Sequence, residues 1–143
     1  MEIKIEESIG FHSWCVANSI SQLISKNFRL NGLELPHSQF VILKILYENG
    51  AKTQQEIADF LFKDKSAVKR SLDILIKKEL VTIESAGSGK YVHLTEKAVN
   101  YKEIIDITIE YTLKQATKGI SPKKIDEIIK YMDKIYHNIK ENL

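Results

Sequence analysis

The sequence predicts a mainly α-helical protein with one β-hairpin between its fourth and fifth helices. Apolar residues recur at helical spacing in six stretches. The period changes to alternation only after Glu79, where Val81–Glu84 and Tyr91–Leu94 flank a Gly/Ser-rich tip, Ser85–Gly89. The chain has 143 residues, 43% of them hydrophobic, with only two prolines. It is therefore neither disordered nor collagen-like, and its length fits one folded domain with helical extensions.

The first two helices are bounded by turn residues. An apolar stripe from Ile9 to Phe28 predicts a helix that ends at Asn31-Gly32, because both residues tolerate a left-handed cap. Pro36 suits the first turn of a second helix, which Asn49-Gly50 ends.

The third and fourth helices begin with side-chain caps. Thr53 and Glu56 form a capping-box pattern, and Asp64 is a candidate N-cap for the helix that follows. The fourth helix has one clean amphipathic stripe, made by Val68, Leu72, Leu75 and Ile76.

Two longer helices close the chain. Thr95 caps a fifth helix that stops at Gly119, and Ser121-Pro122 opens a sixth. The apolar stripe of the sixth helix comprises Ile125, Ile128, Ile129, Met132, Ile135, Tyr136 and Ile139. This stripe has more apolar residues than one thin two-helix layer would cover, which favours a two-fold partner over a monomer that folds these helices onto its own core.

Two short helices joined by a tight turn and followed by a hairpin form a winged helix-turn-helix, whose second helix enters the major groove of duplex DNA. Between Lys63 and Arg70 there are four basic groups and one acid, the densest positive stretch in the chain. Lysine and arginine neutralise phosphates, and arginine can grip a guanine edge. We expect the DNA contacts to come from Thr53, Gln54, Lys63, Lys65, Ser66, Lys69, Arg70 and Lys90.

Four stretches carry a resemblance to a known family. They are Leu35–Leu43 (LPHSQFVIL), Thr53–Ala58 (TQQEIA), Asp64–Val81 (DKSAVKRSLDILIKKELV) and Leu94-Thr95. In this order and spacing they resemble the core of the MarR (multiple antibiotic resistance) family of winged-helix transcriptional regulators. The resemblance implies a dimerisation helix in residues 1–34, a DNA-binding domain in residues 35–95 and dimerisation helices in residues 96–143.

The resemblance also implies a homodimer that binds a palindromic operator in double-stranded DNA, acting as a ligand-responsive repressor. Relatives hold small phenolic or aromatic acids between the dimerisation helices and the winged domain. Residues that could line such a cleft here are Phe11, His12, Trp14, Phe40 and Tyr47.

The sequence departs from the family at the wing. The tip lacks the usual Asp-x-Arg, so Lys90 is its one basic candidate, and two glycines predict a flexible tip. Specificity should then rest on Ser66, Lys69 and Arg70. The glycine usual before the first wing strand is replaced by Glu79, a change that we expect the fold to tolerate.

Two other functions stay open. One branch of the family senses peroxides through a single cysteine in the first helix, which makes Cys15 a possible redox site, although Trp14, Val16 and Ala17 are its neighbours and that helix holds no tyrosine. The second alternative is a winged-helix module that binds proteins and no DNA.

Composition excludes several classes. A single cysteine cannot form an internal disulfide, and no apolar run approaches the ~20 residues that cross a bilayer. The N-terminus is too acidic for a signal peptide, so we expect a cytoplasmic protein.

The four histidines show no ligand spacing, and no phosphate loop or catalytic triad is present, so we expect no metal, no cofactor and no enzyme activity. The net charge of +2 means that any positive surface must be local.

Overall fold

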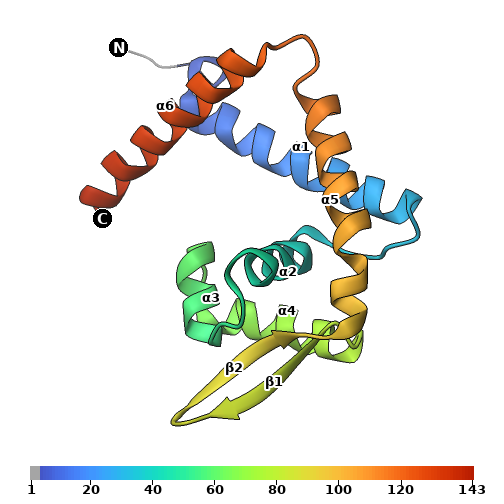
Figure 1. Ribbon diagram of the computed structural model, residues 1–143. Coiled ribbons are helices and arrows are strands. Elements are labelled where there is room, and N and C mark those ends of the chain that lie inside the picture. Colours follow the sequence, from blue (N-terminus) through green and yellow to red (C-terminus); the bar gives the residue numbers. More distant parts are fainter. Residues whose placement is uncertain (1–3) are drawn as a thin grey trace.

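The structure is a computed structural model that describes residues 4–143, and it has six α-helices and one hairpin within that range (Figure 1). The elements are η1 Ile5–Glu7, α1 Ile9–Leu30, α2 His37–Asn49, α3 Gln54–Leu61, α4 Lys65–Lys77, β1 Val81–Ala86, β2 Gly89–Leu94, α5 Glu96–Ala116 and α6 Pro122–Glu141. This order confirms the predicted mainly α fold with a two-stranded wing.

Most helix boundaries lie where local chemistry predicts them. Ser121 caps α6 through the Lys124 N–H, and Thr95 caps α5 through the Ala98 N–H. The second helix differs slightly, because Pro36 is its N-cap and the first helical residue is His37.

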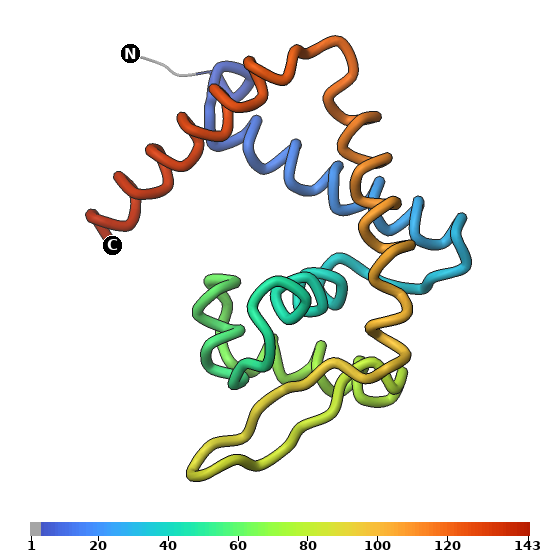
Figure 2. Tube along the Cα trace, in the orientation of Figure 1, coloured from blue at the N-terminus to red at the C-terminus, as the bar shows by residue number. Residues whose placement is uncertain are grey.

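The core lies within the winged unit formed by α2, α3, α4 and the hairpin. Fully buried side chains come from each of its helices and from the two that cross it, for example Leu43, Ile57, Leu75, Phe28 of α1 and Ile105 of α5. Figure 1 shows α1 and α5 crossing beside this unit, and Figure 2 shows the chain turning back after α5 so that α6 runs toward α3.

Polar side chains fix the crossing of α1 and α5. Asn27, which is buried, donates from Nδ2 to Thr112 Oγ1 at 2.8 Å and to Gln115 Oε1 at 2.9 Å. Asn31 Nδ2 donates to Thr108 Oγ1 at 3.1 Å. Because buried polar groups are costly when unpaired, these bonds specify one register between the two helices.

An ionic cluster joins α5 to α2. Asp106 accepts from Lys102 at 2.6 Å and from Lys44 at 3.0 Å, and Lys44 also pairs with Glu48 at 3.1 Å. Hydrogen bonds from Lys102 and Lys44 lower the pKa of Asp106 below its usual value. The carboxylate therefore favours the folded state while it is ionised.

This lowered pKa predicts a pH-dependent effect of Asp106→Asn. The carboxylate contributes stability above its unfolded pKa of about 3.9, and loses that contribution as the pH falls through its lower folded pKa. The variant should unfold at lower urea concentration than the wild type at pH 7, and the gap should close as the solution is acidified. Glu103→Gln, at an exposed position of the same helix, should show no such closing gap.

The residue that follows α4 adopts an unfavourable backbone conformation. Glu79 has φ of 59°, in the left-handed region, and its N–H donates to the Ile76 carbonyl. The next N–H, that of Leu80, donates to the Leu75 carbonyl and completes a Schellman-type helix end. A glycine would adopt this conformation without steric cost. The fold therefore accepts Glu79 in place of the glycine, as expected, but the backbone of Glu79 is strained.

We predict that Glu79→Gly stabilises the fold by about 1 kcal/mol, because it removes the left-handed penalty of a side chain with a Cβ. Urea unfolding at fixed protein concentration measures the difference. Glu103→Gly is the matched control, because Glu103 is exposed in the middle of α5. There the same substitution should destabilise by about 1 kcal/mol. A loss of stability at both positions would contradict the interpretation of Glu79.

No helix within residues 4–143 is long and apolar enough to span a bilayer.

Candidate nucleic-acid interface

Side-chain caps fix the start of both helices in the helix-turn-helix of α3 and α4. Thr53 Oγ1 accepts from the Glu56 N–H at 3.1 Å, and Glu56 Oε2 accepts from the Thr53 N–H at 2.9 Å. Asp64 Oδ1 accepts from the Ala67 N–H at 2.7 Å. Each cap satisfies amides that have no partner within the helix. The predicted capping box and N-cap are both confirmed.

Gln54 connects α3 to α4. Its Nε2 donates to the Lys65 carbonyl at 3.0 Å, across the turn, and the side chain is half-buried, as is Thr53. Both residues therefore support the start of α4, beside any contact that they make to DNA. Sequence reasoning missed this role because a bond between residues 11 positions apart leaves no mark in local spacing.

The buried face of α4 is narrower than predicted. Val68, Leu72 and Leu75 are at most 2% exposed, whereas Ile76 is 39% exposed. The prediction was wrong for Ile76 because it lies about 100° around the helix from Leu75, beyond the line that contacts the core.

The opposite face of α4 is exposed and basic. It presents Lys65, Ser66, Lys69 and Arg70, and we call these four residues the α4 reading face. Lys69 Nζ lies 3.1 Å from Asp73 Oδ2, so part of its charge is neutralised. Within residues 4–143, Lys65 and Arg70 have no acidic partner. Their charges are therefore available to a polyanion.

The wing is more regular than the sequence predicts. Its antiparallel ladder runs from Val81↔Leu94 to Ala86↔Gly89, so only Gly87 and Ser88 form the turn. The Gly87 φ of 59° suits the first central position of a type II′ hairpin turn. The sequence predicts a flexible tip over Ser85–Gly89, but in the structure Ser85, Ala86 and Gly89 belong to the strands.

The hairpin is also anchored at its base. Lys52 and Val92 exchange two backbone hydrogen bonds, at 2.7 and 3.4 Å, which attach the segment before α3 to β2. Lys90 is exposed and lies opposite Ser85, next to the turn. The wing therefore holds its one lysine on a fixed strand.

The arrangement matches a known family. Residues 35–84, from just before α2 into β1, match the MarR family model. Over these residues, which make up the winged helix-turn-helix, the chain is similar to the MarR family.

Solved structures extend the likeness to the MarR-type outer helices. A BpsR structure from Bordetella bronchiseptica has a TM-score of 0.84 at 16% identity, covering 95% of this chain and 98% of that one. A MarR transcriptional regulator from Methanosarcina mazei Go1 has 0.83 at 19% identity, covering 94% and 91%. A probable transcriptional regulator from Pseudomonas aeruginosa has 0.82 at 18% identity, covering 92% and 99%. Over more than nine-tenths of its length the chain thus has the fold of these regulators.

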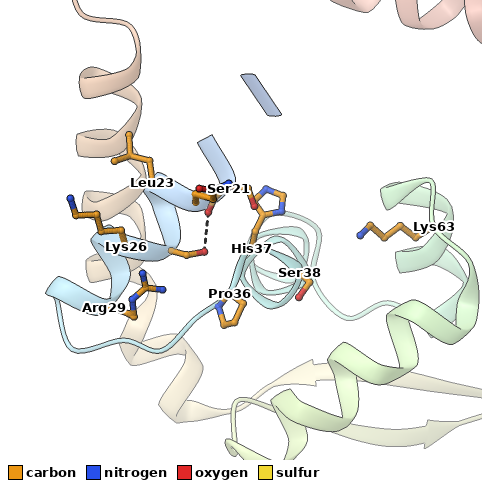
Figure 3. A pocket seen from close by; sticks show the side chains of 10 residues that line it. Ser21, Leu23, Lys26, Arg29, Pro36, His37, Ser38 and Lys63 are labelled. Atoms are coloured by element: carbon orange, nitrogen blue, oxygen red, sulfur yellow. Dashed lines mark hydrogen bonds between the residues drawn. The ribbon is translucent and has the colours of Figure 1, made fainter. Parts of the chain in front are cut away.

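Two clefts flank the start of α2 in this MarR-type domain. The first, of about 770 Å³, lies between α1 and α2 and is bordered by Lys26, Arg29, His37 and Lys63 (Figure 3). The second, of about 500 Å³, lies between α2 and α4; it shares His37 and Lys63 with the first and adds Arg70. No acidic residue lines either cleft within residues 4–143. Burial and the nearby Lys63 charge lower the pKa of His37, as expected in a positive, partly desolvated site.

The residues predicted for an effector pocket lie on two helices, and none of them lines these two clefts. Phe40 is buried beside Phe28, with ring centroids 5.6 Å apart, and the Tyr47 hydroxyl donates to the Ala98 carbonyl. The other three, Phe11, His12 and Trp14, lie in the first turns of α1, where no residue before Ile24 is buried.

Cys15 lies in the same part of α1. It is a free thiol, and its residue is half-buried. Trp14 and Val16, its neighbours in sequence, are both exposed. A redox role for the Cys15 thiol stays a prediction from the sequence.

Proposed function

We propose that this protein is a sequence-specific, DNA-binding transcriptional regulator that represses transcription from a palindromic operator. The observation that carries the proposal is the α4 reading face, which projects from a helix whose other side is fixed in the core. In a helix-turn-helix this helix lies in the major groove. Lys65 and Lys69 are suited to phosphates, and Arg70 can donate two hydrogen bonds to a guanine edge.

The wing is expected to contribute less. Lys90 is the only lysine or arginine on the hairpin, and Glu84, its only acid, lies on the facing strand with its side chain on the opposite face of the hairpin, near His93. A carboxylate near the duplex repels phosphates and offsets part of the lysine's attraction. Base selectivity should therefore come mainly from α4.

A homodimer would cover the surface that this chain leaves open. α6 buries none of its residues, although Ile128, Met132 and Ile139 share one face and are each about half exposed. The first turns of α1 are also unburied. A two-fold partner packed on these helices would place two α4 helices ~34 Å apart, one turn of duplex.

A small acidic effector would fit the charge of the two clefts. DNA binding by the Bordetella BpsR protein is regulated by 6-hydroxynicotinic acid. In this chain the clefts carry basic and no acidic side chains within the described residues, which favours an anion. An aromatic effector could also contact Phe11, His12 or Trp14 if a partner subunit packs on α1. The effector would act by binding one conformation of the dimer more tightly than another, where the two conformations differ in the spacing of their α4 reading faces.

Binding of a labelled mixed-sequence duplex, followed by fluorescence anisotropy over a range of salt concentrations, tests the DNA-binding proposal. The logarithm of the association constant should fall linearly with the logarithm of salt concentration. The double variant Lys69→Glu, Arg70→Glu should lose binding. Lys130→Glu with Lys134→Glu, the same charge reversal on α6, should retain it. If the wild type retains no duplex even at low salt, the protein-interaction module is the better interpretation.

The Lys69–Asp73 ion pair leads to a separate prediction. Asp73→Asn removes the charge that partly neutralises Lys69, so duplex affinity at low salt should rise and the salt slope should steepen by up to about 0.9, the value of one phosphate contact. Asp126→Asn, at an exposed position of α6, should change neither quantity. An unchanged slope in Asp73→Asn would mean that Lys69 does not face a phosphate.

A further inference from the structure

The end of α6 meets the turn of the helix-turn-helix. α6 buries none of its own residues, yet its last two turns and the end of α3 border one cleft of about 580 Å³. Figure 1 shows the C-terminal end of α6 on the same side of the molecule as α3, above and to the left of it in this view. The residues that line this cleft include Asp59, Phe62 and Lys63 on one side and Tyr136, Lys140 and Leu143 on the other.

Phe62 makes the closest aromatic contact across this cleft. Its ring centroid is 4.9 Å from that of Tyr136, with the planes tilted by 46°. Lys140 Nζ lies 5.6 Å from the centroid of the same ring. Tyr136 and Lys140 are four residues apart, so they lie on one face of α6. Both side chains contact the phenyl ring of Phe62.

The backbone at Phe62 is unusual for an aromatic residue. Its φ of 53° and ψ of 38° are left-handed, and its N–H donates to the Asp59 carbonyl. The Lys63 N–H donates to the Ala58 carbonyl. A glycine would form this helix end without strain, so local structure alone does not explain a phenylalanine. The side chain that a glycine would lack makes the contact with α6.

The same turn leads directly into α4. Asp64, the N-cap of α4, is two residues after Phe62, and Lys65 and Ser66 begin the reading face. We propose that Phe62 is a positioning residue: by packing on Tyr136 and Lys140, it ties the start of the recognition helix to α6. The placement of α6 against a partner subunit would then set how α4 meets the duplex. This inference rests on the proposed dimeric DNA-binding function.

Substitutions at Phe62, compared in the full-length protein, test the proposal. Hydrogen exchange is measured at residues 62–66 and 136–143, together with binding of the duplex obtained by selection from random sequence. Phe62→Ala should speed exchange in both segments and weaken duplex binding about tenfold. Phe60→Ala removes an equally large ring from α3, 57% exposed where Phe62 is 67% exposed, and should change neither. Phe62→Tyr should keep wild-type behaviour.

Two further variants separate positioning from folding. Phe62→Gly removes the ring but also the left-handed strain, so it should stay folded and still lose the link to α6. Tyr136→Ala should reproduce Phe62→Ala, and the double variant should add little. If hydrogen exchange at residues 136–143 is the same in Phe62→Gly and wild type, Phe62 does not hold α6 and the proposal is wrong. If the wild type binds no duplex, the proposed function fails, while hydrogen exchange still decides whether Phe62 holds α6.

Discussion

Arg70→Ala is expected to weaken binding of the selected duplex by about 1–3 kcal/mol, roughly 5- to 150-fold in Kd, and to relax the choice of one base pair in each half-site. The reason is that Arg70 is exposed on the reading face and has no acidic partner within residues 4–143, so its fork of donors is free for a base edge. Anisotropy with duplexes that differ at single positions measures both effects.

Lys65→Ala is the matched comparison on the same face. It should weaken every duplex by a similar factor and reduce the salt slope by about 0.9, because it removes a phosphate contact and no base contact. If Arg70→Ala instead lowers all affinities equally and leaves the base preference intact, Arg70 binds phosphate and another residue reads the sequence.

Met132→Glu is expected to give the second large effect, loss of the dimer. Met132 lies at the centre of the unburied apolar face of α6, with Ile128 and Ile139 on either side of it along the helix. A partner packed on this face would bury an unpaired carboxylate, which costs several kcal/mol. Sedimentation should then show a monomer, and duplex affinity should fall by about 100-fold or more because the two half-sites are no longer bound together.

Asn138→Glu adds the same charge outside this apolar face and should leave a dimer that binds as the wild type does. Asn138 is exposed, and its carbonyl accepts from Asn142 within the helix. A Met132→Glu protein that remains dimeric would place the interface on other helices.

Local chemistry explains which parts of the fold could be predicted. The capping box of Thr53 and Glu56 and the cap at Asp64 depend on residues at most three positions apart, and the structure confirms them. The wing was predicted less well. Serine and glycine indicated a loop, but because Gly87 permits a two-residue turn, the strands continue through Ser85 and Ala86.

Long-range contacts could not be predicted from spacing. The bond from Asn27 to Thr112 joins residues 85 positions apart, and the contact of Phe62 with Tyr136 depends on where α6 lies. Likewise, the residue type of Phe40 gives no sign that it packs beside Phe28 in the core. Residue type and helical periodicity show which side chains are available, and tertiary packing decides what each one contacts.

Binding-site selection from random duplex tests the central claim most directly, because it examines sequence recognition and dimer geometry together. The account predicts enrichment of a two-fold symmetric motif whose half-sites are centred about 10 base pairs apart, one turn of duplex. It also predicts that the Lys69→Glu, Arg70→Glu protein enriches nothing. Failure of the wild type to enrich any motif, or enrichment of a single asymmetric half-site, would contradict it.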